Sequence, residues 1–342
     1  MSEHSYPPVT WLIPVKNGMP YLTETLASLA SQTYKEFQVL AWDNGSTDGT
    51  VEELRRWIPT RLQGRIVTDD PRSLGGSRAR LVEVAETELC ALVDADDICH
   101  PNRLEQQLEF MSTHPEIALV GSQLRILNER GEPTGESFPY FLAHDDIVHT
   151  FLLGNHIAQP SVLFRRSAVL SAGNYDSEAI FEDYELWLRF AQHHKMANLA
   201  SCLVDYRIRP ESDSRLKEKH RGMESLLVSC LGKHAQGLFG LTTREAERLR
   251  HRQSSFAIAM ARKIANHLAF TQGGSTWSRL RSSSLLDSMR SLTRPRDVLS
   301  RLCFAVLDRR KGSIWRELRL ILAQSLPYPI RALAAKVKRL TK

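Results

Sequence analysis

Short apolar runs alternate with helical patterns along the first part of the chain. Three runs are dominated by apolar residues and closed by polar ones, at 10–15, 37–42 and 89–93. Apolar side chains recur at helical spacing in four further segments, at 21–32, 46–57, 76–85 and 103–113. We therefore expect an α/β domain whose mostly parallel sheet is covered by helices on both faces.

The pattern changes twice further along the chain. Extended segments predominate next, with strands expected at 118–121, 124–127, 161–164 and 199–208, and one helix at 184–193. Beyond about residue 215, the segments 298–307 and 330–340 place apolar residues on one helical face. We divide the chain into a domain at 1–214 and a basic α-helical C-terminal region at 215–342.

The charge is divided in the same way. The 342 residues carry a net charge of +6, but residues 1–214 hold 18 basic and 31 acidic residues, a net charge of −13. Residues 215–342 hold 27 basic and 8 acidic residues, a net charge of +19. A basic amphipathic region either lies on an anionic membrane surface or packs on the acidic domain. It has no recognisable DNA- or RNA-binding motif, so we expect no nucleic-acid partner.

The composition excludes several classes of protein. Hydrophobic residues make up 42% and charged residues 25%, which is typical of a globular chain. No apolar run approaches the ~18 residues of a transmembrane helix, and the first residues do not resemble a signal peptide. Five widely spaced cysteines without a C-x-x-C pair predict neither a disulfide framework nor a zinc site. We expect a cytoplasmic protein, with any membrane contact peripheral and at the inner face of the cell membrane.

Polar residues follow the predicted strands at the edge where an open parallel sheet binds its ligand. The segments concerned are 14–17, 43–44 and 94–97. Three carboxylates lie within 94–97, and a divalent cation such as Mg²⁺ or Mn²⁺ would relieve their mutual repulsion. Helix capping explains one or two of these acids as well, so both interpretations stay open at this point.

Other candidates carry similar alternatives. Arg78 and Arg80, on the helix before the acidic cluster, either bind phosphate or lie exposed on the helix. Glu182 and Asp183 begin a predicted helix, where they either cap it or provide a general base. Trp187 lies one turn beyond Asp183 and is either a wall for a sugar or a core residue.

Taken in order, these segments resemble the family 2 glycosyltransferases, which have the GT-A fold. The resemblance runs through residues 9–209 and rests on the segments 14–18, 31–34, 43–50, 77–80, 94–97, 159–165, 173–175 and 182–189. Each segment is short, but together they match in order and spacing. The resemblance implies a nucleotide-binding sheet and glycosyl transfer in bacterial polysaccharide or glycoconjugate biosynthesis.

The resemblance also implies a role for each matching residue. The nucleotide sugar would contact Pro14, Asn17, Asp43, Asn44, Arg78, Asp94 and Arg209. Asp96 would coordinate Mg²⁺ or Mn²⁺ on the donor diphosphate, and Asp183 would be the general base of an inverting transfer. Glu182 and Trp187 would lie on the acceptor side. The donor would be a nucleotide sugar, with UDP favoured, and the acceptor a hydroxyl group of a glycan or lipid-linked molecule.

Three features depart from the family pattern, and one of them is that no asparagine follows Arg78 in the segment 78–81. Arg209 stands where many relatives have a histidine near the metal or diphosphate, and a guanidinium can hold phosphate oxygens but cannot ligate a metal. Gln159 also stands where relatives often carry histidine. Two alternative functions are a sugar nucleotidyltransferase, for which the loop at 15–20 is a poor phosphate loop, and a non-catalytic scaffold that binds sugar nucleotides at the membrane.

Overall fold

A computed structural model describes residues 6–136, 138, 140–210, 212, 222–250, 260, 263–265 and 267–268. The chain forms two compact units, Met1–His234 and Ala235–Lys342, and each is described by itself. The predicted amphipathic segments at 298–307 and 330–340 lie outside the described residues.

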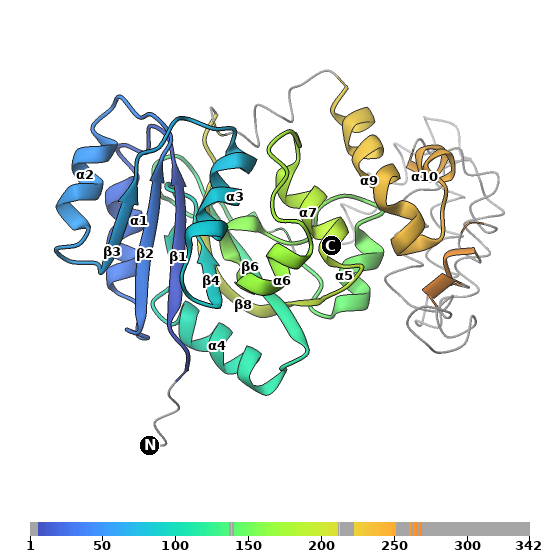
Figure 1. Ribbon diagram of the computed structural model, residues 1–342, viewed down its shortest axis with the longest axis horizontal. Coiled ribbons are helices and arrows are strands. Elements are labelled where there is room, and N and C mark those ends of the chain that lie inside the picture. Colours follow the sequence, from blue (N-terminus) through green and yellow to red (C-terminus); the bar gives the residue numbers. More distant parts are fainter. Residues whose placement is uncertain are drawn as a thin grey trace, which may run out of the picture. The chain divides into compact units, whose positions relative to one another are not determined.

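The described part of the first unit contains one eight-stranded sheet (Figure 1). Its strands are β1 (Val9–Val15), β2 (Phe37–Asp43), β3 (Gly64–Val67), β4 (Leu89–Leu92), β5 (Ile98–Cys99), β6 (Ile117–Leu127), β7 (Leu163–Arg165) and β8 (Lys195–Arg207). Their order across the sheet is β3-β2-β1-β4-β7-β6-β8-β5. The first four in this order run parallel, and β6 pairs in parallel with β8, whereas β7 and β5 are antiparallel to their neighbours. The predicted α/β fold with a mostly parallel sheet is confirmed.

Helices are present at the five predicted segments of the first unit, and two further helices, at 144–150 and 166–171, were not predicted. They are α1 (Leu22–Ala30), α2 (Thr50–Trp57), α3 (Leu74–Val84), α4 (Arg103–Thr113), α5 (His144–Thr150), α6 (Arg166–Ser171), α7 (Glu182–Phe190), α9 (Met223–Phe239) and α10 (Thr243–Arg250), with a 3₁₀ turn, η1, at Gln159–Ser161. Helix α2 begins later than predicted, because Ser46 and Thr47 bind the loop after β1 instead of capping a helix. Strand β6 is continuous where two strands were predicted, and its pairing with β8 shifts register at Ser122 and Gln123. Among the described helices, none combines the length and apolarity that a membrane span requires.

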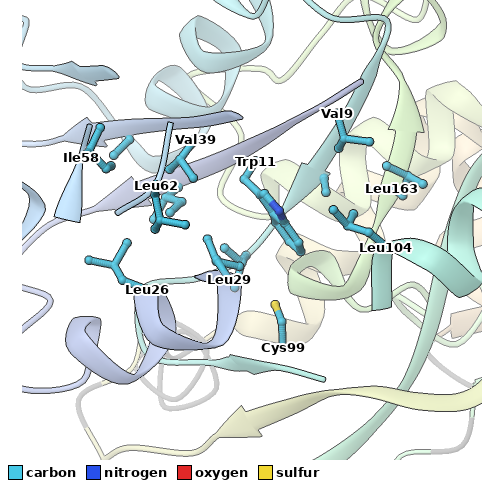
Figure 2. Close-up of a cluster of buried hydrophobic side chains, with 14 of the residues drawn as sticks. Val9, Trp11, Leu26, Leu29, Val39, Ile58, Leu62, Cys99, Leu104 and Leu163 are labelled. Atoms are coloured by element: carbon cyan, nitrogen blue, oxygen red, sulfur yellow. The ribbon is translucent and has the colours of Figure 1, made fainter. Parts of the chain in front are cut away.

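Helices α1, α2 and α4 close one face of the sheet. The core on this face joins alternate residues of β1 to Leu29 of α1, Leu54 of α2 and Leu104 of α4. Trp11 of β1 is fully buried, and Figure 2 shows its ring between Leu29, Leu104 and Cys99. Helix α3 packs against β1 and β2, and β1 is buried along its whole length.

A buried arginine fixes the end of β4. The Arg103 guanidinium donates to the carbonyl oxygens of Leu92 at 2.8 Å, Pro160 at 2.7 Å and Val162 at 3.2 Å. It also lies 4.8 Å from the centroid of the Trp11 ring. These hydrogen bonds satisfy carbonyl groups that water does not reach. They hold the start of the acidic segment 94–97 against the turn η1.

Candidate active site

A cavity of about 1080 Å³ opens at the carboxyl ends of β1 and β4, within the first unit. Nine of the residues predicted from the sequence line it: Pro14, Asn17, Asn44, Arg78, Asp94, Asp96, Glu182, Asp183 and Arg209. Aromatic side chains such as Tyr140 and Phe181 line it as well. Ligands of open α/β sheets bind at this edge, so the cavity is the candidate active site.

Hydrogen bonds join the loop after β1 to the loop after β2. The N–H of Asn17 donates to Ser46 Oγ at 2.8 Å, and the N–H of Thr47 donates to Asn17 Oδ1 at 2.9 Å. The N–H of Met19 donates to Asp48 Oδ2 at 2.9 Å. Asn17 has a φ of +53°, a left-handed conformation that asparagine adopts more readily than most residues. The polar residues after β2 therefore shape the cavity partly by fixing the loop that follows β1.

Asp43 and Asn44 differ in their access to the cavity. Asp43 is 6% exposed, does not line the cavity, and accepts hydrogen bonds from the N–H groups of Gly45 and Ser46 at 3.3 Å. Asn44 lines the cavity while its amide pairs with the backbone of Arg72, through two hydrogen bonds of 2.7 Å. The carboxylate of Asp43 therefore stabilises the turn after β2, and its contact with the nucleotide stays a prediction.

Arg78 joins the acidic segment after β4 to the first turn of α7. Its Nη2 donates to Asp94 Oδ1 at 2.9 Å, and its Nη1 donates to Glu182 Oε1. The side chains of Arg78 and Glu182 are each 5% exposed. Burial lowers the pKa of Arg78, but Asp94 and Glu182 outweigh this effect and raise it above its usual value. Arg78 therefore stays charged and fixes two carboxylates, and Glu182, predicted on the acceptor side, is its buried partner.

Asp96 is paired with the second predicted arginine. Arg209 Nε donates to Asp96 Oδ2 at 2.6 Å. Burial raises the pKa of Asp96, while Arg209 lowers it. The adjacent Asp97 is fully buried and accepts a hydrogen bond of 2.9 Å from the N–H of Arg207. Burial and the neighbouring Asp96 raise the pKa of Asp97 well above its usual range, so Asp97 serves the packing of this segment.

Asp94 and Asp96 are the residues that fit a divalent cation. Mg²⁺ prefers oxygen ligands, and it typically takes one or two protein carboxylates together with phosphate oxygens and water. Each of these carboxylates engages its arginine through a single oxygen. The described residues contain no group of three or more His, Cys, Asp or Glu side chains that would hold a metal alone. This donor set fits an ion shared with a diphosphate.

Asp183 lies in the first turn of α7 and is held by an asparagine. Its Oδ2 accepts a hydrogen bond of 2.7 Å from Asn155 Nδ2, and Asn155 Oδ1 accepts one of 3.0 Å from the N–H of Ile157. The second bond fixes which end of the Asn155 amide faces the carboxylate. Tyr140 lies nearby, and burial and Asp183 raise its pKa to about 12. All four residues line the cavity.

Trp187 does not reach the cavity. Its side chain is fully buried, and its ring packs edge-on against Tyr175 and Phe190 with centroid distances of 6.4 and 6.2 Å. The prediction of Trp187 as an acceptor-side wall is wrong, and the core alternative is correct. Most of α7 beyond Asp183 is buried, so only the start of the helix is available to a ligand.

Comparison with known proteins decides the family. The sequence profile described as Glycosyl transferase family 2 matches residues 10–171. The amylovoran biosynthesis glycosyltransferase AmsE of Erwinia amylovora is 32% identical over 207 residues, which cover 59% of this chain and 74% of that protein. This chain belongs to glycosyltransferase family 2.

Further relatives of this family 2 glycosyltransferase agree. The O-antigen biosynthesis glycosyltransferase WbnJ of Escherichia coli is 28% identical over 200 residues, covering 57% of this chain and 77% of that protein. The crystal structure of S. aureus TarS 1–349 in complex with UDP-GlcNAc has a TM-score of 0.54 and 16% identity, covering 94% of this chain and 93% of that one. The predicted GT-A fold and the predicted enzyme class, a glycosyltransferase, are confirmed. The nucleotidyltransferase and scaffold alternatives are not supported.

The cavity of this family 2 glycosyltransferase includes residues that the sequence analysis missed. Tyr140 precedes helix α5 and Asn155 follows it, both in short segments where the sequence shows no regular period of apolar residues. The available signal was proximity, since Asn155 lies four residues before the segment 159–165 that carries the family resemblance. A polar residue so close to that segment was a reasonable candidate for the site.

Proposed function

We propose that the chain transfers a sugar from a nucleoside diphosphate donor, with UDP-sugars favoured, to a hydroxyl group of a glycan or lipid-linked acceptor. The transfer inverts the anomeric carbon, Asp183 is the general base, and Asp96 holds Mg²⁺ or Mn²⁺. One observation carries the proposal: a single cavity is lined by Asp94 and Asp96 from the end of β4 and by Asp183 from the start of α7.

The partners of these acids suit two different tasks. Asp94 and Asp96 are each paired with an arginine, so positive charge accompanies them at the cavity wall. Such a mixed group is suited to a diphosphate and its counter-ion. Asp183 instead accepts a hydrogen bond from the neutral amide of Asn155, which leaves its carboxylate suited to take a proton.

The proposed reaction is a single displacement. The acceptor hydroxyl oxygen attacks the anomeric carbon while the bond from that carbon to the diphosphate oxygen breaks. Asp183 takes the hydroxyl proton, and the electron pair of the broken bond stays on the diphosphate. Attack opposite the leaving group inverts the configuration and needs no covalent sugar–enzyme intermediate. A divalent ion, when bound at Asp96, neutralises negative charge that develops on the diphosphate.

We extend the proposal to the cellular setting and to the two domains. Residues 1–214 form the catalytic domain, and residues 215–342 hold the enzyme peripherally at the inner face of the cell membrane. The support is the net charge of +19 on residues 215–342, since each basic residue near an anionic surface adds about 1 kcal/mol. A surface location would bring the active site to lipid-linked acceptors.

UDP with Mn²⁺ is expected to raise the melting temperature more than UDP alone. In Asp96→Asn, the additional rise that depends on Mn²⁺ is expected to be lost. A ligand at about 100 times its Kd stabilises the folded state by about 2.7 kcal/mol. Thermal unfolding with UDP, GDP and dTDP, each with and without Mn²⁺, measures this effect and identifies the base. The exposed Asp69, which does not line the cavity, provides the matched control Asp69→Asn. Absence of any shift, or an unchanged Mn²⁺-dependent shift in Asp96→Asn, would refute the proposed donor site.

Asn155→Ala is expected to lower kcat by about tenfold and to move the acidic limb of the pH–rate profile to higher pH. The Asn155 hydrogen bond stabilises the ionised carboxylate of Asp183, so its loss favours the protonated form, which cannot accept a proton. Activity then begins to fall at a higher pH as the solution is acidified. The measurement is kcat/KM across the pH range, with the exposed Asn102→Ala as the matched control.

Four neighbouring groups do not titrate along the acidic limb. Arg78 stays charged because Asp94 and Glu182 raise its pKa against burial. Burial raises the pKa of Tyr140 and of Cys230 to about 12, and it raises that of Tyr175 as well, so all three stay neutral. A lower kcat with an unmoved acidic limb would mean that Asn155 only supports the fold.

A further inference from the structure

Arg209 places a positive charge on the carboxylate proposed to hold the metal. The Arg209 Nε to Asp96 Oδ2 distance is 2.6 Å, and both residues line the cavity. The Arg209 side chain is 29% exposed and the Asp96 side chain 15%, so water screens the pair only partly. A partly enclosed, charge-assisted hydrogen bond of this length is stronger than an ordinary surface ion pair.

The ring of Tyr21 lies beside Arg209 and beside a second arginine, Arg207. The Arg209 guanidinium lies 5.3 Å from the ring centroid of Tyr21, and that of Arg207 lies 4.8 Å from the same ring. Arg207 is 2% exposed, donates from Nε to the carbonyl oxygen of Asp96 at 3.0 Å, and pairs with Glu24. Arg207 is therefore occupied in the wall, and Arg209 is the arginine that faces the cavity.

The other arginine of the cavity wall cannot take over this task. Arg78 is shared between Asp94 and Glu182, and its side chain is 5% exposed. Arg209 is the more exposed of the two, and its planar guanidinium matches the oxygen pairs of carboxylates and phosphates. A divalent ion that binds Asp96 meets the positive charge of Arg209 at the same carboxylate, and like charges at such short range repel.

We propose that Arg209 is a resident cation at Asp96, which competes with a divalent ion for this carboxylate and gives the site affinity for a diphosphate without metal. The inference deepens the proposed function and rests on it for the class of ligand. Removal of the charge at residue 209 should therefore raise the affinity for a divalent ion and lower the affinity for a diphosphate in the absence of metal.

The first measurement is Mn²⁺ binding by the full chain without nucleotide, followed through the paramagnetic resonance signal of free Mn²⁺. Arg209→Gln is expected to bind Mn²⁺ about tenfold more tightly than the wild type, because a repulsive charge is gone. Arg209→Lys keeps the charge and is expected to stay close to the wild type. Arg80→Gln is the matched control, since Arg80 does not line the cavity.

The second measurement is calorimetric titration with inorganic diphosphate and with UDP, in the presence of a chelator. Arg209→Gln is expected to weaken both by about tenfold, which corresponds to the loss of one charge-assisted contact. Inorganic diphosphate makes the result independent of the nucleoside base. A variant that merely damaged the fold would bind both Mn²⁺ and diphosphate more weakly.

Three outcomes would overturn the inference. The first is a Mn²⁺ affinity that is unchanged or lower in Arg209→Gln, and the second is Mn²⁺ binding by Arg209→Lys that is as tight as by Arg209→Gln. The third is metal-free diphosphate binding that does not depend on Arg209. Both measurements report binding and do not involve Asp183. A failed transfer assay, which would count against the proposed function, therefore leaves their interpretation intact.

Discussion

Asp183→Asn is expected to lower the rate of sugar transfer by about 10³-fold, within the range typical for loss of a general base. The amide keeps the size of the side chain but cannot take the proton of the acceptor hydroxyl. Asp183 lines the cavity at the start of α7, whereas the diphosphate is proposed to bind at Asp94 and Asp96, at the end of β4. The Kd for UDP with Mn²⁺ is therefore expected to stay unchanged, and the measurement pairs initial transfer rates with calorimetric UDP binding.

The matched control for this variant is Asp69→Asn, the same chemical change at an exposed acid outside the cavity. It should keep the wild-type rate. Asp183→Asn with nearly full activity would remove Asp183 from the reaction. A parallel loss of UDP affinity would mean that Asp183 belongs to the donor site.

Arg78→Met is expected to lower the free energy of unfolding of the first unit by about 3–5 kcal/mol, the usual result of removing one partner of a buried ion pair. Methionine fills much of the space of the arginine stem, but the buried carboxylate of Glu182 loses its charge partner. Asp94 loses the same partner at the end of β4. Urea unfolding followed by tryptophan fluorescence measures the loss, since Trp11, Trp42, Trp57 and Trp187 all lie in the first unit.

A second substitution separates charge from packing in this prediction. Arg78→Met with Glu182→Gln also removes the buried carboxylate charge that Arg78 pairs with, and it should recover part of the lost stability. If the double variant is less stable than Arg78→Met alone, the effect comes from packing and not from the buried charge. An exposed ion pair contributes at most about 1 kcal/mol to stability. If Arg78→Met lowers the free energy of unfolding by less than that, the result would contradict the buried ion pair.

Much of the site could be predicted from the sequence because many of its residues come directly after predicted strands. Polar residues that close apolar runs meet at one edge of a parallel sheet, which brought Asn17, Asn44 and Asp96 to one cavity. The start of a helix likewise marked Asp183. These inferences need only local pattern and the rule for where parallel strands end.

The features that could not be predicted depend on how side chains from different segments of the chain pack together. Trp187 shares a helix with Asp183, but its ring also packs against Tyr175, which lies outside the helix and which the helical period does not identify. The pairing of Arg209 with Asp96 joins residues 113 positions apart through the end of β8. Asn155 lies in an irregular segment, where no period of apolar residues indicates which side chains face a cavity.

The most direct test of the account follows the sugar itself. A UDP-sugar of known α configuration is incubated with the enzyme and Mn²⁺, and proton NMR records the release of UDP and the anomeric configuration of the product at early times. An inverting transfer with Asp183 as the base predicts donor consumption with a β-configured product, and loss of this turnover in Asp183→Asn. A product that keeps the α configuration, or turnover that survives in Asp183→Asn, would contradict it.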